Sequence, residues 1–208
     1  MDSLEHYLES SSALHRHLCP RQVLGVRMGL LAAKLLSMAM PQNDKRLLTI
    51  AETDGCFVDG ISAVTNCAVG HRTLRIEDCG KIAATFVDTE TPRRIRLIPQ
   101  ETIRTLAYEF APGVSSKWQA QLLGYQRIPD EQLFHIQDIE LLIPIEKMVS
   151  KAGRKVICQQ CGEEIINERE AILNGQILCK PCAGSSYYRL REDGHAFAVE
   201  PTEDWAIR

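Results

Sequence analysis

Four cysteines near the C-terminal end of the chain have the types and spacing that a zinc ion requires. Cys158 and Cys161 form one C-x2-C pair, and Cys179 and Cys182 form a second pair seventeen residues later. Four thiolates complete the tetrahedral coordination of a structural zinc site and leave no position open for substrate. A segment of about 55 residues buries too little apolar surface to fold alone, so the metal must supply folding free energy. We therefore predict a structural zinc site; two redox dithiols are the alternative.

The residues around these pairs predict how the segment folds. Asn174-Gly175 lies between apolar residues, which is typical of a type I′ hairpin, because both central residues of that turn need positive φ. The stretch GSSYYRLRE, residues 184–192, can form a helix after the second pair. This order predicts a small treble-clef zinc-finger domain. A zinc ribbon, which has a strand in place of the last helix, is the alternative.

A second group of soft ligands lies much earlier in the chain. The stretch HRHLCP places His15, His17 and Cys19 within five positions, and Pro20 follows at once. Proline is favoured at the first position of a helix, so Cys19 would be the N-cap of a helix expected over 20–39. The free N–H groups and the helix dipole favour an anion there, and hence the thiolate. We predict that His17 and Cys19 bind a metal or form a reactive pair, with His15 a weaker candidate.

The next expected helix, over 55–67, carries further candidates. Asp54 is expected to cap it, and Cys56 lies in its first turn, where the thiolate is again favoured and where it could join the first group. Asp59 lies three residues further on the same face and could act as a ligand or a base. Cys67 lies about 16 Å along a continuous helix from Cys56, so it is a weaker candidate in another part of the cleft. The alternatives are a small buried thiol at Cys56 and a solvated carboxylate at Asp59.

The apolar pattern predicts an α+β fold with a mainly antiparallel sheet and packed helices. The stretch VLGVRMGLLAAKLLSMAM is apolar on nearly every side, which predicts a buried helix, and Gly25 and Gly29 on one of its faces predict a close backbone approach. Strands are expected over 46–53, 72–76, 81–87 and 94–98, and the three strands between 72 and 98 are expected to form a meander. A long final strand is expected over 133–146. Further helices are expected over 3–14, 100–110 and 114–126.

The sequence predicts two domains. The apolar pattern lapses at VSKAGRKV, so we place a boundary near 148–155, between a core domain over 1–150 and a zinc-finger domain over 151–208.

Composition and charge limit the classes of function. The chain has a net charge of −3, and residues 151–208 hold eight basic and nine acidic residues, so nucleic acid is a less favoured partner of the finger than protein.

The expected location is the cytoplasm. The N-terminus does not resemble a signal peptide, and no apolar run of about 18 residues is present, so no membrane segment is expected. In a reducing compartment the eight cysteines are better interpreted as metal ligands or reactive thiols than as a disulfide framework.

Three motifs in the first 90 residues form a specific combination. They are H-x-H-x-C-P followed by G-V-R-M-G, then D-G-C-x-x-D-G-I followed by T-x-C-x-x-G, and then D-x-G-K-I-A-A-T-F. Over roughly residues 10–135 the chain resembles the FmdE family, named for the E component of formylmethanofuran dehydrogenase. The resemblance implies an α+β core, often dimeric, with an optional treble-clef zinc domain, and an association with molybdenum or tungsten formylmethanofuran dehydrogenase and one-carbon metabolism in methanogens. It also matches His17, Cys19, Cys56 and Cys67 to the family's His/Cys positions.

The chain departs from that family pattern at three positions. Arg16 and Arg21 stand where the family usually has glycine, and Asn66 stands where it has glycine before the later cysteine. The two arginines bring positive charge to the mouth of the expected site. They would depress the pKa of Cys19 further or attract an anionic ligand.

Two classes of function follow from these features. The first is a metal-binding protein that serves metalloenzyme-linked one-carbon or redox metabolism, either as an accessory protein or as an enzyme. Its core site, built on His17, Cys19 and Cys56, would hold a second transition metal. Sulfur and nitrogen ligands suit zinc and similar metals better than magnesium or calcium. If the site is catalytic, Cys19, Cys56 and Asp59 are the candidates. The second is a regulator or scaffold, whose finger binds a partner protein or DNA while the core domain senses a ligand. The resemblance and the apolar helix predict a homodimer.

Overall fold

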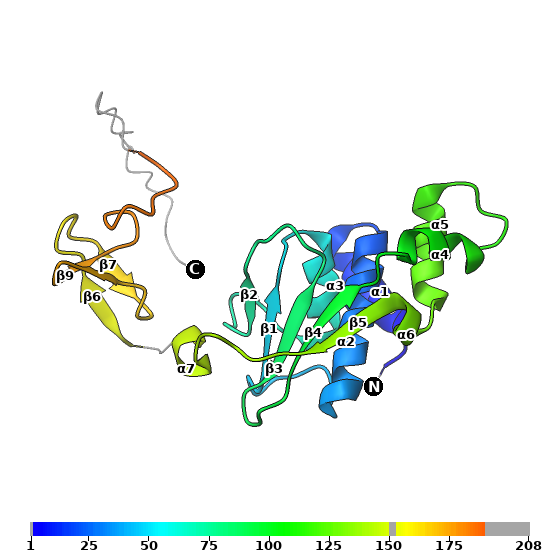
Figure 1. Ribbon diagram of the computed structural model, residues 1–208, viewed down its shortest axis with the longest axis horizontal. Coiled ribbons are helices and arrows are strands. Elements are labelled where there is room, and N and C mark those ends of the chain that lie inside the picture. Colours follow the sequence, from blue (N-terminus) through cyan, green and yellow to red (C-terminus); the bar gives the residue numbers. More distant parts are fainter. Residues whose placement is uncertain (1, 150–152, 190–208) are drawn as a thin grey trace, which may run out of the picture. The chain divides into compact units, whose positions relative to one another are not determined.

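The computed structural model describes residues 2–149 and 153–189, and the chain divides into two compact units, Met1–Val149 and Ser150–Arg208. The first, the core unit, is an α+β domain (Figure 1). No helix among the described residues is long and apolar enough to cross a membrane. The core unit contains the helices α1 (Leu4–His15), α2 (Pro20–Leu36), α3 (Cys56–Thr65), α4 (Ile103–Glu109), α5 (Lys117–Arg127), α6 (Asp130–Leu133) and α7 (Ile145–Met148), and the strands β1 (Leu47–Ala51), β2 (Leu74–Ile76), β3 (Ala84–Asp88), β4 (Arg94–Pro99) and β5 (Phe134–Asp138).

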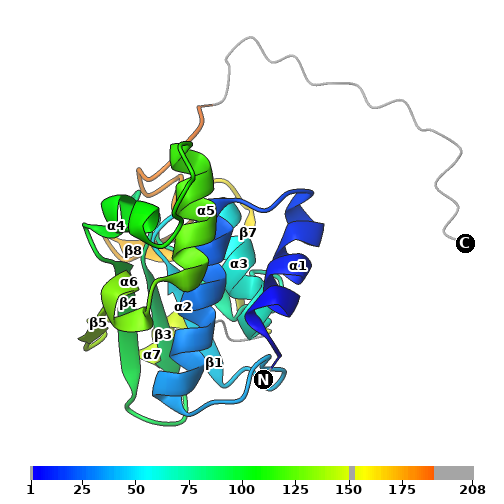
Figure 2. The ribbon, with the colours of Figure 1, turned by 90° about the vertical axis from the view of Figure 1, so that its right-hand side faces the viewer.

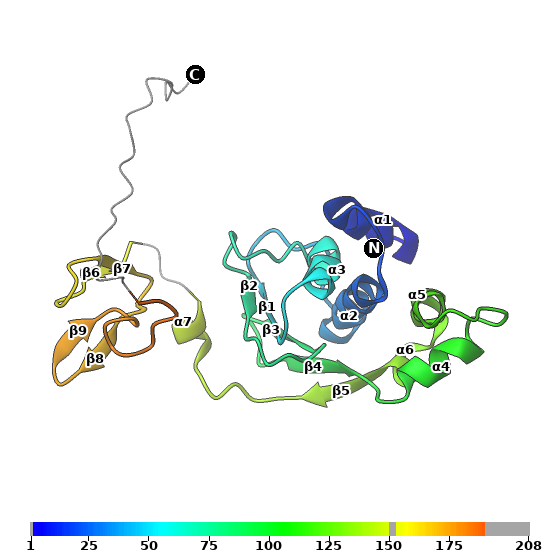
Figure 3. The same ribbon diagram turned by 90° about the horizontal axis from the view of Figure 1, so that it is seen from above.

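A five-stranded sheet of order β2-β1-β3-β4-β5 forms the base of the core unit. Only the β1–β2 pair is parallel, so the predicted α+β fold with a mainly antiparallel sheet is confirmed. Helices α2 and α3 lie between α1 and the sheet, as seen in Figure 3. Figure 2 shows α2 running alongside both α3 and α5. Strands β1 and β3 are buried along their whole length, which places the core between them and α2 and α3.

Two predictions about the strands are wrong. The segments over 72–98 do not form a meander, because β2 pairs with β1 and not with β3. All five residues of β1 are buried, whereas β2 buries only Leu74 fully, so the more apolar strand takes the interior position and the short one takes the edge.

The long strand predicted over 133–146 is limited to the five residues of β5. Beyond it the chain packs Leu141, Ile145 and Met148 against the buried residues Leu48, Ile50 and Val87. Pro144 lacks the N–H that a strand ladder would need, and it begins α7 instead. Burial against a second small cluster therefore decides the path of this segment.

Two glycines set the distance between α2 and α3. A Cβ on Gly25 would lie 2.2 Å from the carbonyl oxygen of Phe57, and a Cβ on Gly60 would lie 2.3 Å from the carbonyl oxygen of Gln22. The two backbones therefore touch, as only glycine permits. Gly29 continues the contact against Val64, so the helices run in the same direction and their N-terminal ends meet.

An ion pair joins the chain before β1 to the end of β3. Asp88 is fully buried and accepts two hydrogen bonds from Arg46, which hold the pKa of its carboxyl at about 2. A carboxyl whose pKa is lower in the folded state stabilises the fold above its ordinary pKa of 3.8, and this stabilisation is lost as the pH falls through about 2. We expect Asp88→Asn to lower the free energy of unfolding by about 2 kcal/mol at pH 7 and by less at pH 3.

Urea unfolding at the two pH values measures this effect. Glu90→Gln is the matched control, because Glu90 also contacts Arg46, at 3.4 Å, but its side chain is 67% exposed. An equal loss of stability in both variants would contradict the assignment of the stabilisation to the buried carboxylate.

The second unit, which we call the finger, contains two small hairpins. Strands β6 (Lys155–Ile157) and β7 (Glu164–Ile166) form one, and β8 (Ala171–Leu173) and β9 (Gln176–Leu178) form the other. Asn174 and Gly175 have φ of 51° and 77°, so the predicted hairpin turn is confirmed.

The helix predicted over 184–192 is not found in residues 184–189, and residues 190–192 lie outside the described residues. The Ser186 hydroxyl donates to the carbonyl of Tyr188 and accepts from its N–H. Such local side-chain bonds compete with helical hydrogen bonds. The helix that would distinguish a treble clef from a zinc ribbon is thus absent from the described part of the finger.

Candidate metal centres

The four cysteines of the finger converge as predicted. Their sulfur atoms all lie within 4.8 Å of one another, at the ends of the two hairpins. Four sulfurs on a tetrahedral zinc ion, each at about 2.3 Å, would lie about 3.8 Å apart. The sulfurs of Cys161 and Cys179 are 3.8 Å apart. The donor set and its geometry therefore fit zinc.

The acidities of these thiols also favour a bound dication. Backbone N–H groups of Cys161 and Cys179 lower the pKa of Cys158 to about 6. The N atom of Cys179 lies 3.3 Å from the sulfur of Cys158. The neighbouring thiols, Cys179 first, raise the pKa of Cys182 to about 12. Without metal the four groups cannot all ionise near pH 7, because adjacent thiolates repel each other. A zinc ion removes this repulsion and binds all four thiolates.

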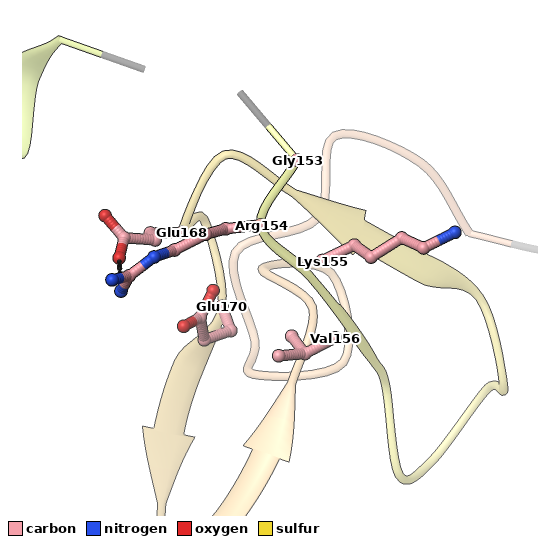
Figure 4. A pocket seen from close by; sticks show the side chains of 6 residues that line it. All are labelled: Gly153, Arg154, Lys155, Val156, Glu168 and Glu170. Carbon is pink, nitrogen blue, oxygen red and sulfur yellow. Dashed lines mark hydrogen bonds and ion pairs between the residues drawn. The ribbon is translucent and has the colours of Figure 1, made fainter. Parts of the chain in front are cut away.

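A cavity of about 250 Å³ lies elsewhere on the finger, and three of its four charged lining residues form ion pairs. Figure 4 shows Arg154 extended toward Glu168, with an Nη1–Oε1 distance of 2.5 Å, while Lys155 points away from this pair. Lys155 is paired with Glu164 at 2.8 Å. The Arg154–Glu168 pair joins the residue before β6 to a residue after β7, and the Lys155–Glu164 pair joins the two strands of the hairpin.

In the core unit, the sulfur atoms of Cys19 and Cys56 are 3.0 Å apart. Cys19 is the N-cap of α2, as predicted, and its N–H donates to the side chain of Gln22 at 2.8 Å. Cys56 is the first residue of α3. The N-cap of that helix is Gly55, with φ of 82°, and not Asp54 as expected. The close packing of α2 on α3 therefore brings together two cysteines that are 37 residues apart in the chain.

Two of the other predicted ligands, His17 and Asp59, do not complete a three-ligand group with this pair. Among the described residues, only the finger cysteines form a group of three or more ligand atoms within 4.8 Å of one another. Exposed His17 and half-buried Asp59 therefore lie outside such a group with both sulfurs. His15 is the last residue of α1, and its side chain is outside the described part of the structure. A three-ligand core site stays a prediction.

Cys67 lies at the other end of α3, and the expectation that it lies apart from Cys56 agrees with this placement. It is buried, and its sulfur accepts a hydrogen bond from the hydroxyl of Thr49 at 3.4 Å. Burial raises the pKa of its thiol. Its surroundings are those of a packed core residue.

The predicted thiolate at Cys56 is wrong for the metal-free protein. Burial, together with the neighbouring Cys19, raises the pKa of Cys56 to about 11, although the charge of Arg21 and the helix N–H groups lower it. Partial burial and a second thiol thus outweigh the helix terminus. At neutral pH the Cys56 sulfur is protonated, so metal binding there would release a proton.

Comparison with known proteins adds to this geometry. The family described as "FmdE, Molybdenum formylmethanofuran dehydrogenase operon" matches residues 14–135. The chain belongs to the FmdE family. Residues 152–188 match the prokaryotic dksA/traR C4-type zinc finger, which agrees with the four-cysteine site. The resemblance inferred from the three sequence motifs is therefore confirmed, and the FmdE match contains both Cys19 and Cys56.

Two individual proteins are also similar. A protein of Archaeoglobus fulgidus named "Probable S-adenosyl-L-methionine-binding protein" is 29% identical over 206 residues, which cover 88% of this chain and 54% of that protein. The chain thus spans about half the length of this curated relative. A crystal structure of a tungsten formylmethanofuran dehydrogenase FmdE-like protein from Syntrophus aciditrophicus has a TM-score of 0.58 at 22% identity and covers 90% of this chain and 96% of its own. This likeness shows a shared fold.

Proposed function

We propose that this FmdE-family protein binds a thiophilic metal ion at Cys19 and Cys56, besides the zinc of the finger, and serves metalloenzyme-linked one-carbon or redox metabolism as an accessory protein or an enzyme. The observation that carries the proposal is the 3.0 Å approach of two sulfurs at the N-terminal ends of two helices. Both helix ends direct positive dipole charge at the thiolates that a metal would bind.

The pair fits a metal ion with a small adjustment. Two thiolates on one zinc ion lie about 3.8 Å apart, so the sulfurs would separate by less than about 1 Å, which a side-chain rotation can supply. Cys56 is partly exposed and Cys19 is buried, so an ion could enter from the side of Cys56. His17 lies in the short connection between α1 and α2, and we propose it as the third ligand after this connection moves.

A bound ion with an open position would act as a Lewis acid. The protein groups around the two sulfurs would position the ligands and adjust their charge. Gln22 holds the Cys19 backbone, Gly25 and Gly60 hold the two helix ends together, and Arg21 supplies a positive charge that favours the ionised thiol of Cys56. Asp59 stays the candidate for a base.

Metal analysis of the full-length chain tests this proposal. We expect protein purified without chelator or nickel to hold about two metal ions per chain by mass spectrometry, and Cys19→Ser to hold about one. Cys79→Ser is the matched control, because Cys79 is an exposed thiol of the same unit and should leave the metal content unchanged. One ion per chain in all three proteins, with unchanged unfolding temperatures, would contradict the core site.

A second function, partner recognition by the finger, is favoured by its exposed apolar side chains. Four large ones are at least half exposed on the described hairpins: Ile157, Ile166, Ile172 and Leu173. Apolar surface of this kind suits a protein partner better than a phosphate backbone. The homodimer and the cytoplasmic location stay predictions.

A further inference from the structure

The core unit has an open cleft of about 860 Å³ whose lining includes neither Cys19 nor Cys56. It is lined by the start of α2, the loop before β3, the end of β4, and α4 and α5. The cleft gathers five of the 24 Lys and Arg residues of the chain but one of its 27 Asp and Glu residues, Glu101. In a chain of net charge −3 this is a local excess of positive charge. The cationic residues are Arg21, Lys81, Arg96, Arg104 and Lys117.

Four of the five cations have no ion-pair partner among the described residues, although the charge of Lys81 also acts on Glu52. Arg96 is paired with Glu52, with an Nη2–Oε2 distance of 2.6 Å, and it also donates to Gln137. The other four cations form no ion pair among the residues that the structure describes. Like charges that line one cleft repel each other, and a bound anion relieves that repulsion.

The floor of the cleft is apolar and carries one unused donor. Leu24, Ile103 and Tyr125 line it and are each at most 5% exposed. The Tyr125 hydroxyl has no hydrogen-bond partner among the described residues. Burial raises the pKa of this phenol and the charge of Arg104 lowers it, so the hydroxyl is a neutral donor close to a cleft cation.

The walls of the cleft are held in place by the packing around them. Arg27 of α2 donates to the carbonyls of Tyr125 and Ile128, at 2.8 and 2.7 Å. A Cβ on Gly124 would lie 2.5 Å from the carbonyl oxygen of Ala107, so α4 and α5 touch directly. Lys117, Gln121 and Tyr125 follow each other at intervals of four residues, which places them on one face of α5. The backbone of the cleft walls is thus fixed before a ligand arrives, whereas the side chains of the four cations other than Arg96 are exposed.

We propose that this cleft binds an organic polyanion, with two or more carboxylate or phosphate groups on Arg21, Lys81, Arg104 and Lys117 and its apolar part on Leu24, Ile103 and Tyr125. The residues that line the cleft do not include Cys19 or Cys56, although the charge of Arg21 acts on both the cleft and Cys56. It does not depend on a metal in the core unit.

Isothermal titration calorimetry of the full-length chain tests the proposal with two probes. Inorganic pyrophosphate represents phosphate ligands, and citrate represents polycarboxylates. We expect at least one probe to bind, and Arg104→Gln/Lys117→Gln to weaken it by at least about tenfold, because each lost charged hydrogen bond costs about that factor. The probe that binds identifies the anionic group, and its affinity should fall as salt is added.

A matched double variant separates a built site from general charge attraction. Lys45→Gln/Arg72→Gln removes two exposed cations of the same unit that do not line the cleft, and it should bind like the wild type. Tyr125→Phe keeps the packing of the floor and should weaken binding by a few fold without a change in salt dependence. No heat from either probe, or equal weakening in both double variants, would overturn the proposal.

Discussion

Replacing Cys161 with serine is expected to release the finger zinc and unfold the finger while the core unit stays folded. Cys161 is exposed, so the change removes a metal ligand without opening a cavity. Structural zinc sites of this type contribute on the order of 10 kcal/mol of folding free energy. The finger cannot replace this from its own core, whose buried residues are Cys158, Ile165 and Leu178.

Amide hydrogen exchange measures this prediction residue by residue. Protection in β6 to β9 should disappear in Cys161→Ser and in wild type treated with a chelator, whereas protection in β1 and β3 should remain. Cys79→Ser removes another exposed thiol, outside the metal site, and should leave both units protected. If the finger strands stayed protected without zinc, packing and not metal would hold the finger together.

Replacing Gly25 with alanine is expected to lower the free energy of unfolding of the core unit by about 3 kcal/mol. The new methyl group would lie 2.2 Å from the carbonyl oxygen of Phe57 and 3.0 Å from the N atom of Ile61. Because these atoms belong to the backbone of α3, no side chain can rotate away, and the two helices must separate.

The separation of the helices should also increase the distance between the sulfurs of Cys19 and Cys56, because the contact between the two helices holds these sulfurs 3.0 Å apart. Guanidinium unfolding measures the stability, and the metal content of the folded variant reports on the pair. Gly70→Ala is the matched control, since a Cβ there would meet no atom within 4 Å. A Gly25→Ala variant as stable as Gly70→Ala would mean that the helices are not in direct contact.

The sequence by itself determined the features that depend on residues close together in the chain. Two C-x2-C pairs identify the zinc ligands, because each pair forms one local turn. Asn174-Gly175 specifies its hairpin, because the turn needs positive φ at both residues. Cys19 followed by Pro20 marks the start of α2. Three motifs, none of them specific alone, were enough to indicate the family.

The tertiary structure alone decided which distant segments meet. Competition for burial placed β1 between β2 and β3 and packed residues 141–148 against a second cluster. The sequence suggested that Arg21 could attract an anion, but it did not indicate that Arg104 and Lys117 would face the same cleft. Likewise, the pKa of Cys56 rises because packing buries it beside Cys19, which outweighs the local effect of the helix end. Local signals act through the backbone of a few residues, whereas long-range neighbours are selected by the packing of whole faces.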